Sequence, residues 1–299
     1  MGRKFYLECA SGISGDMLAA SLLDLGADEQ KLRAVLESLP LDGYQLRVST
    51  VEKSGIACRD FDVRMEDNHD HDMDYLYGSH THQDETGYAV HHGRHLSDII
   101  QIIDAGKMSD EARVLAKKIF AILAQAEGKV HGVDPEEVHF HEVGAVDSIV
   151  DIVSIAVLAD DLGMDEVYID ALSEGKGMIR CQHGILPVPV PAVSAVSSLY
   201  DIPLRIMDYQ GEFVTPTGIA AVAALWNGRK LPERFRIIQT GYGAGKRKTE
   251  AAGFLRVMEI ETEEGAEDRL WKLQTNIDDC SGQVLGYTQI GRASCRERV

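Results

Sequence analysis

The sequence predicts an α/β (α+β) fold in which helices pack on a mixed β-sheet. Short apolar strand patterns alternate with helical patterns along most of the chain. The chain has 299 residues, 44% of them hydrophobic, which is enough to bury a substantial core. Residues 66–95 interrupt the alternation with a polar, histidine-rich segment, which is expected to be a flexible loop inserted in the domain.

Residues 1–65 are predicted to form an N-terminal α/β unit. Its expected elements are, in order, a strand at 4–9, a glycine turn in GISGD, helices at 17–26 and 28–39, and two strands within 44–65. Gly26 is expected to end the first helix, because glycine readily adopts the left-handed conformation of a helix C-terminus. Ser54 and Gly55 break the last segment, which indicates a turn between its two strands.

Residues 96–265 are predicted to form the rest of the main domain. The expected elements are helices at 96–104, 109–132 and 144–163, strands or a hairpin at 167–172 and 175–184, helices near Pro191 and Pro216, and two strands around the glycine-rich turn GYGAG. Residues 266–289 are expected to begin a truncated C-terminal domain, with a strand at 271–279. Residues 290–299, IGRASCRERV, match the translation of a sequencing adapter and are expected to be an artefact.

Composition excludes several classes of function. The net charge of -18 disfavours nucleic acid as a partner, because phosphate recognition needs clustered Lys and Arg. No stretch reaches the about 20 apolar residues of a membrane helix, and the N-terminus lacks the apolar core of a signal peptide. The five cysteines form no CxxC pair. A cytoplasmic protein with no membrane partner is therefore expected.

The stretch VHFHEVGAVDSIVDIV suggests a metal site. His139 and His141 are two residues apart, so on a strand both imidazoles lie on one face. Glu142 follows them, and Asp147 and Asp151 share one face of the next helix at i,i+4 spacing. Nitrogen and oxygen donors together suit a borderline divalent ion. Two alternatives remain open: a structural histidine pair, and an Arg partner for the two aspartates.

Two glycine-rich segments and one helix start are candidate cofactor-binding sites. Backbone N–H groups at a turn before a helix favour an anion such as phosphate, and a nearby Lys adds positive charge. The candidate residues are Gly12, Ser14, Gly15, Asp16, Thr215, Thr217, Gly243, Gly245 and Lys246. The alternative is that the glycines form tight structural turns and the two threonines only cap a helix.

Seven of the 11 histidines lie between residues 66 and 95. They are His69, His71, His80, His82, His91, His92 and His95. A flexible tract of this kind chelates nickel, copper or zinc with little selectivity. A solvated linker rich in His and Asp is an equally good interpretation.

Six segments, in order, resemble the LarC family, the nickel insertion proteins of the lactate racemase cofactor pathway. They are YLECASGISGDMLAASLLDLG, VHFHEVGAVDSIVDIV, HGILPVPVPA, EFVTPTGIAA, TGYGAG and TNIDD. The resemblance implies a nickel chelatase of the lyase class, which inserts Ni(II) into pyridinium-3,5-bisthiocarboxylic acid mononucleotide. It further implies dependence on CTP with Mg or Mn, a homo-oligomer, and transfer of the product to a nickel-pincer-dependent enzyme.

In such a reaction a carboxylate must accept the proton lost by the pyridinium carbon, and Glu142 is our candidate for this base. Two other functions stay open. The first is nickel storage or delivery without catalysis. The second is a Mg-dependent phosphate-ester enzyme that uses Asp16 and the other aspartates.

Overall fold

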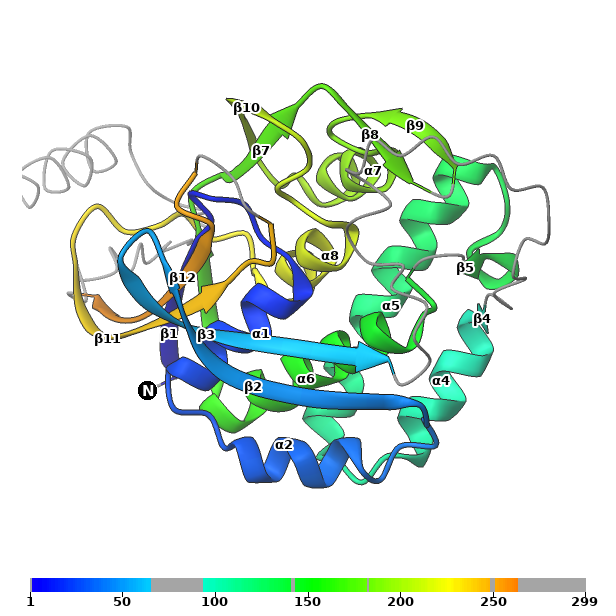
Figure 1. The fold of residues 1–299 in the computed structure, drawn as a ribbon, viewed down its shortest axis with the longest axis horizontal. Helices are drawn as coiled ribbons and strands as arrows, with labels where there is room; N and C mark the ends of the chain where they lie inside the picture. The colour runs from blue at the N-terminus through cyan, green and yellow to red at the C-terminus, as the bar shows by residue number, and fades with distance from the viewer. Residues whose placement is uncertain (1, 66–93, 141–142, 182, 248–250, 263–299) are drawn as a thin grey trace, which may run out of the picture. The chain divides into compact units, whose positions relative to one another are not determined.

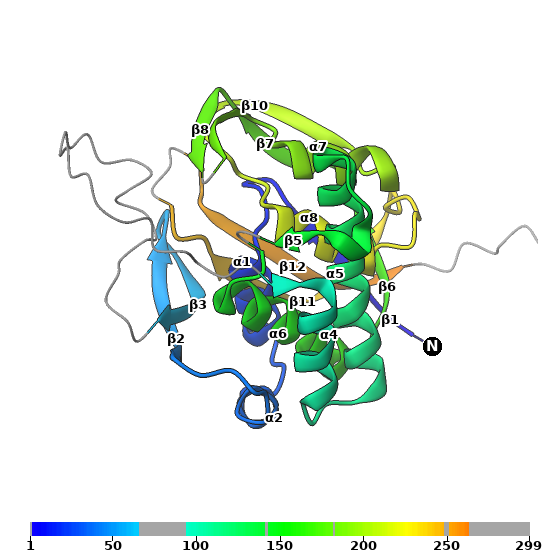
Figure 2. The same cartoon turned by 90° about the vertical axis from the view of Figure 1, so that its right-hand side faces the viewer.

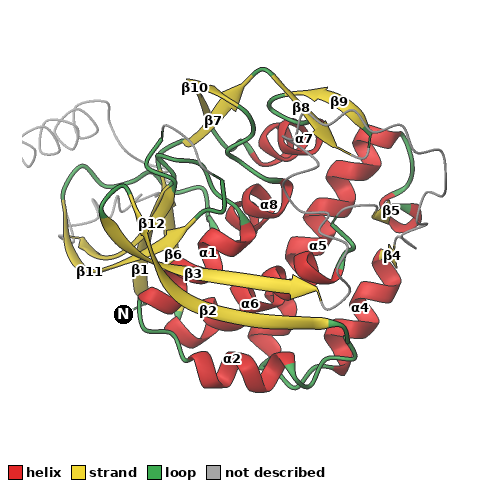
Figure 3. Cartoon of the chain, viewed as in Figure 1, coloured by secondary structure: helices red, strands yellow, loops and turns green. Residues whose placement is uncertain are grey.

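A computed structural model describes residues 2–65, 94–140, 143–181, 183–247 and 251–262. The chain divides into two units, Met1–Thr262 and Glu263–Val299, and the second lies outside the described residues. The strand expected at 271–279 and the segment 290–299 therefore have no structural account. The first unit confirms the predicted fold class, with helices packed on a mixed sheet (Figures 1 and 3).

The main sheet has six strands in the order β2-β3-β11-β12-β1-β6. The strands are β1 (Arg3–Glu8), β2 (Tyr44–Lys53), β3 (Ile56–Met65), β6 (Met164–Ile169), β11 (Phe235–Ala244) and β12 (Phe254–Thr262). Strand β1 runs antiparallel to β12 and parallel to β6, while β3 and β11 are parallel. The two ends of the described chain thus meet at the centre of one sheet.

Three two-stranded sheets complete the strands of the described chain. They pair β4 (Arg94–His95) with β5 (His139–Phe140), β7 (Leu172–Lys176) with β10 (Leu204–Gln210), and β8 (Met178–Cys181) with β9 (Gly184–Pro187). Of the strands or hairpin expected at 167–172 and 175–184, the second segment contains β8 and the start of β9, which form a hairpin that extends to Pro187. The strand expected at 167–172 is divided between β6 and β7. His95, which the sequence placed in the flexible segment, instead lies in a strand, because its backbone pairs with that of His139.

The helices form the second layer of the molecule. They are α1 (Gly15–Asp24), α2 (Glu29–Leu36), α4 (Leu96–Ala105), α5 (Asp110–His131), α6 (Val146–Leu162), α7 (Pro191–Tyr200) and α8 (Pro216–Leu225). Figures 1 and 2 show α1 and α6 between the six-stranded sheet and helices α4 and α5. Helix α6 is buried on nearly all sides, which explains its continuous apolar sequence. No helix of the described ranges is long and apolar enough to cross a membrane.

Glycines in β11 allow α1 to lie directly against the sheet. A Cβ atom on Gly243 would lie 2.0 Å from the carbonyl oxygen of Met17, and one on Gly241 would lie 2.2 Å from that of Ser21. The sequence interpretation of these glycines as a turn is therefore wrong. They lie within the strand, and their lack of a side chain is required by the close approach of the α1 backbone.

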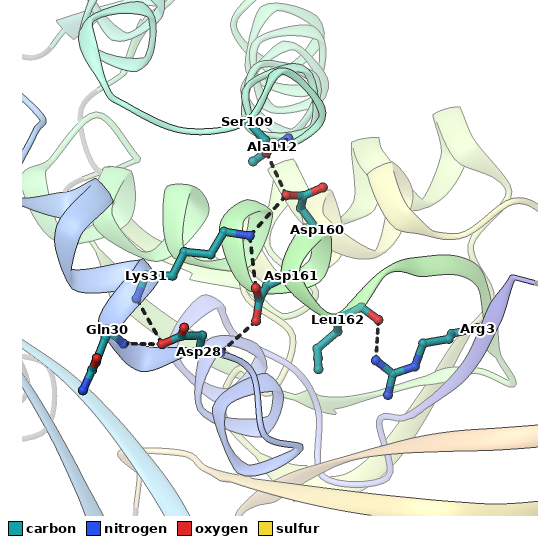
Figure 4. Close-up of polar contacts among 9 residues, drawn as sticks. All are labelled: Arg3, Asp28, Gln30, Lys31, Ser109, Ala112, Asp160, Asp161 and Leu162. Atoms are coloured by element: carbon teal, nitrogen blue, oxygen red, sulfur yellow. Dashed lines mark hydrogen bonds and ion pairs between the residues drawn. The ribbon is translucent and has the colours of Figure 1, made fainter.

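Polar contacts hold the C-terminal end of α6 (Figure 4). Lys31 of α2 places its Nζ 3.0 Å from Asp161 and 3.8 Å from Asp160. The hydroxyl of Ser109, which caps α5, donates to Asp160 at 2.7 Å, and Arg3 of β1 donates to the carbonyl of Leu162. These contacts join three elements to one end of α6. They hold the C-terminal end of α6 against its neighbours.

Candidate functional site

A cavity of about 440 Å³ lies where the N-terminal ends of α1, α6 and α8 meet β3 and two loops. Its lining residues are Ser11, Ser14, Gly15, Asp16, Met17, Phe61, Asp62, Val63, Asp147, Ser148, Asp151, Glu212, Phe213, Thr215, Thr217, Gly245, Lys246, Arg247 and Gly253. The volume lies in the range of sites for small ligands. The mixture of carboxylates, two cations and aromatic side chains favours a polar ligand that also carries a flat apolar part.

Three helices direct their N-terminal ends at this cavity. The N-cap residues Ser14 of α1 and Thr215 of α8 line it, and so does Asp147 in the first turn of α6. Unpaired N–H groups and the helix dipole make the N-terminal end of a helix attractive to an anion. Close packing brings the ends of α1 and α8 together: a Cβ on Gly218 would lie 2.4 Å from the Ile13 carbonyl oxygen.

Asp16, Asp147 and Asp151 place three carboxylates in the cavity. Asp16 accepts hydrogen bonds from the Ser14 hydroxyl and, at 2.8 Å, from the Met17 N–H. Burial raises the pKa of Asp151 well above its ordinary value, and the charges of Asp16 and Asp147 raise it further. Burial also raises the pKa of Asp16, although the hydrogen bond from Ser14 opposes this shift. The carboxylates repel one another, so a bound cation would stabilise them.

Gly15 determines how closely α1 approaches α6. A Cβ atom at this position would lie 2.7 Å from Oδ2 of Asp151, too close for any ordinary contact. The backbone of the first turn of α1 therefore packs directly against the side chain of Asp151 on α6. Any larger residue at position 15 would displace that carboxylate.

The two cations of the cavity wall are already paired with acids. Lys246 Nζ lies 2.7 Å from Asp60 and 3.2 Å from Asp62. Burial is the largest effect and lowers the pKa of Lys246, but the hydrogen bond to Asp60 and the charges of Asp60, Asp16 and Asp62 together outweigh it, so the net shift is upward. Arg247 donates to the backbone carbonyl of Glu212 and lies 2.9 Å from its carboxylate. A ligand phosphate would have to share these cations with the carboxylates.

Glu174, which the sequence did not single out, supports the cavity wall from behind. Its side chain is fully buried, and Oε1 accepts hydrogen bonds from the N–H groups of Gly175 at 2.8 Å, Phe213 at 2.6 Å and Val214 at 3.2 Å. Oε2 is buried with no hydrogen-bond partner. Burial raises the pKa of Glu174, against the effect of these hydrogen bonds. Two of its partners lie about forty residues away in the sequence, so no local pattern could have identified it.

The cavity brings together most of the predicted cofactor-binding residues. Those that line it are Ser14, Gly15, Asp16, Thr215, Thr217, Gly245 and Lys246. Gly12 and Gly243 do not line it. Gly12 has φ +83°, and a Cβ there would lie 2.0 Å from the Phe213 carbonyl oxygen, so its role is in chain packing. Gly243 packs against α1 in the same way.

The structure brings only two of the five predicted metal ligands into the cavity. Asp147 and Asp151 line the cavity, whereas His139 lies in β5 and is not among the lining residues. His141 and Glu142 lie outside the described residues. Over the ranges that the structure describes, no three His, Cys, Asp or Glu side chains are arranged to hold a metal ion. The five-residue ligand set therefore stays a prediction.

Thr215 has a structural role as the N-cap of α8, where its hydroxyl accepts the Gly218 N–H at 3.1 Å. We expect Thr215→Ala to lower the free energy of unfolding by about 1 kcal/mol, the usual effect of losing an N-cap. Thr217→Ala is the matched control, because it removes only the hydroxyl that lies 3.0 Å from Thr215 Oγ1. Urea denaturation measures both, and an equal loss in the two variants would contradict the capping role.

The chain has close relatives among known proteins. A model of the nickel insertion protein family matches residues 5–291. The chain is 45% identical to the pyridinium-3,5-bisthiocarboxylic acid mononucleotide nickel insertion protein of Alkaliphilus metalliredigens, covering 96% of this chain and 71% of the relative. Proteins with the same name from Acetivibrio thermocellus and Geobacillus kaustophilus are 39% and 38% identical, covering 95% and 96% of this chain and 67% and 69% of their own lengths. No solved structure matches the chain.

Proposed function

This chain belongs to the nickel insertion protein family, and we propose that it inserts Ni(II) into pyridinium-3,5-bisthiocarboxylic acid mononucleotide, forming the nickel-pincer nucleotide. The observation that supports this proposal is the meeting of three helix N-termini and three aspartates in one cavity. The helix ends favour the phosphate of a mononucleotide. The carboxylates favour both the pyridinium cation and the nickel ion.

Insertion requires the protein to hold nickel loosely and then release it to the substrate. In our proposal Asp16, Asp147 and Asp151, which are not arranged around an ion in the described structure, close on the nickel ion as oxygen ligands when it enters. The sulfur and carbon atoms of the substrate then replace them in turn. Oxygen ligands bind this borderline ion less firmly than thiolate-type sulfur does, so the exchange proceeds toward the product. His139, His141 and Glu142 remain proposed ligands of the incoming ion.

Formation of the nickel–carbon bond releases a proton from the pyridinium ring, and a carboxylate must accept it. Glu142 is our proposed base from the sequence, and Asp151 is a second candidate. A carboxylate whose pKa is raised by burial is a stronger base than an ordinary one. Comparing product formation in Glu142→Gln and Asp151→Asn distinguishes the two.

The direct test supplies the purified protein with the mononucleotide, Ni(II), CTP and Mg or Mn, and follows the mass of the nucleotide. The expected product carries one nickel in place of a proton, and its formation without CTP would contradict the proposed CTP dependence. Tight nickel binding with no product would favour storage or delivery. Release of inorganic phosphate from the substrate with Mg alone would favour a phosphate-ester enzyme, which the all-oxygen aspartate set makes the second candidate.

Lys246 is expected to bind the phosphate of the substrate. We predict that Lys246→Met weakens substrate affinity about tenfold, the loss expected for one charge-assisted contact. Lys246→Arg should restore part of the affinity, and Lys107→Met, which removes an exposed cation outside the cavity, should leave it unchanged. Calorimetric titration with the mononucleotide in the absence of nickel gives the affinities. Unchanged affinity in Lys246→Met would restrict Lys246 to its ion pairs with Asp60 and Asp62.

A further inference from the structure

Two histidines outside the cavity face each other across the small β4–β5 sheet. His95 and His139 are directly opposite partners in the antiparallel register. Their ring centres are 4.9 Å apart, and the ring planes are nearly perpendicular at 82°. Both side chains are exposed to solvent. The pair joins residues that are distant in the sequence, so no sequence motif contains both.

The spacing of the two rings matches that of two imidazoles on one metal ion. A metal–nitrogen bond of about 2.1 Å places each ring centre about 3.3 Å from the ion. Two ligands at angles between about 90° and 110° then have ring centres about 4.6 to 5.4 Å apart, a range set by the same bond length. The observed 4.9 Å lies inside this range. The spacing of the ring centres is therefore that of a chelating pair, and the ring of His95, which also takes part in the capping box at the start of α4, has to turn a nitrogen toward the ion.

The backbone on both sides of the pair is held in place. The N–H of His95 donates to the Asp98 carboxylate at 3.0 Å, and the Arg94 guanidinium donates to the Gly144 carbonyl at 2.6 Å. Phe140, next to His139, is buried, and its ring lies 6.2 Å from that of Phe120. A chelating pair on a fixed backbone loses little entropy when it binds an ion. The arrangement therefore favours binding over two independent surface histidines.

A second histidine pair provides a natural comparison. The ring centres of His131 and His183 are 5.1 Å apart, but Nε2 of His131 already lies 3.4 Å from the Glu127 carboxylate in an i,i+4 pair on α5. His183 comes from the β8–β9 turn rather than from a paired strand. An ion at this pair would have to compete with Glu127 for His131.

We propose that His95 and His139 form a two-imidazole binding site for a divalent transition ion, with water completing the coordination. Imidazole suits nickel, copper and zinc, and it discriminates against magnesium, which prefers oxygen. The site is separate from the aspartate cavity, and it adds His95 to the proposed ligands of the incoming ion, among which His139 already stands. The proposal depends on the proposed function only for the identity of the ion in the cell, which is nickel.

The test measures nickel binding to the full chain in which His69, His71, His80, His82, His91 and His92 are replaced by Ser, so that the histidine-rich segment does not contribute. Calorimetric titration with Ni(II) compares this protein with His95→Ala, His139→Ala and the double variant. Each single variant should weaken binding at the site at least tenfold, and the double variant should lose less than the sum of the two single effects, because either substitution already breaks the chelate. His131→Ala is the matched control and should leave this site unchanged.

A spectroscopic measurement gives a readout that folding defects do not mimic. With Cu(II) as the probe, electron paramagnetic resonance should show two coordinated imidazole nitrogens in the parent and one in His95→Gln. Small, additive losses of nickel affinity, or an equal loss in His131→Ala, would overturn the proposal. Insertion at saturating nickel is expected to continue in His95→Ala. Failure of insertion in the parent with this site intact would instead count against the proposed function.

Discussion

The Asp151→Asn variant is expected to melt at a higher temperature than the parent protein near pH 8 and to have lost nickel insertion. The gain in stability and the loss of activity have the same cause. Asp151 is held close to Asp16 and Asp147 in the cavity wall, where burial and their two charges destabilise its ionised form. Asn keeps the shape but removes the charge, so the repulsion disappears together with one ligand for the cation.

The pH dependence follows from the direction of the pKa shift. In the folded protein the pKa of Asp151 is raised, whereas in the unfolded chain it is about 3.9. Stability from such a group is fully present below about pH 3.9 and is lost as the pH rises through the raised pKa. The advantage of Asn should therefore be largest at pH 8 and should vanish near pH 4. For a protein of this size each kcal/mol corresponds to about 2–4 °C in Tm, so a shift of a few degrees is expected.

Asp161 on the same helix is the matched control with the opposite sign. Burial raises its pKa, but the Asp28 N–H and Lys31 outweigh this effect, and the net shift is downward (Figure 4). Its ionised form therefore stabilises the fold above the unfolded pKa, and this contribution is lost as the pH falls through the lowered value. Asp161→Asn should reduce Tm at pH 8, with the difference disappearing at low pH. Scanning calorimetry between pH 4 and 8 measures both. A lower Tm for Asp151→Asn at pH 8 would contradict the crowding of carboxylates.

Local signals in the sequence were sufficient for most of the secondary structure. Helix α5 is an example: the cap Ser109 and the left-handed Gly132 enclose Asp110–His131, close to the predicted 109–132. Ser54 and Gly55, both with positive φ, form the predicted turn between β2 and β3. The i,i+4 spacing of Asp147 and Asp151 correctly indicated one partly buried face. In each case the determinants lie within a few residues of one another.

Contacts between distant segments explain what the sequence did not predict. The charge of Asp16 affects Asp151 because α1 and α6 pack together at Gly15, and no pattern near either residue specifies that contact. The glycines of β11 are typical of a turn, yet they serve the packing of α1. Lys246 was assigned to phosphate from its neighbours in sequence, whereas in the structure it pairs with Asp60 and Asp62 of β3. Glu174 was missed for the same reason, because two of its hydrogen-bond partners are distant in the sequence.

Glu174→Leu is expected to produce the largest loss of stability of any substitution considered. Leu has a side chain of similar size to Glu but no oxygen. It therefore leaves the N–H groups of Gly175, Phe213 and Val214 buried without their acceptor. Each buried N–H group without an acceptor costs about 1–3 kcal/mol, so the free energy of unfolding is expected to fall by at least about 3 kcal/mol. The segment before α8 would also loosen, and with it the position of Phe213 in the cavity wall.

Glu174→Gln is the matched control, because its amide oxygen can accept the same three hydrogen bonds. It also removes a carboxyl group whose buried Oε2 has no hydrogen-bond partner and whose ionisation is disfavoured by burial. Gln should therefore retain a Tm near that of the parent at pH 7, while Leu falls by roughly 10 °C. Calorimetry of the two variants, together with the affinity of each for the mononucleotide, separates the backbone support from any role of the charge. If Gln destabilises as strongly as Leu, the charge of the carboxylate, rather than the three accepted N–H bonds, must hold the segment before α8, and the role of Glu174 as a backbone anchor would be wrong.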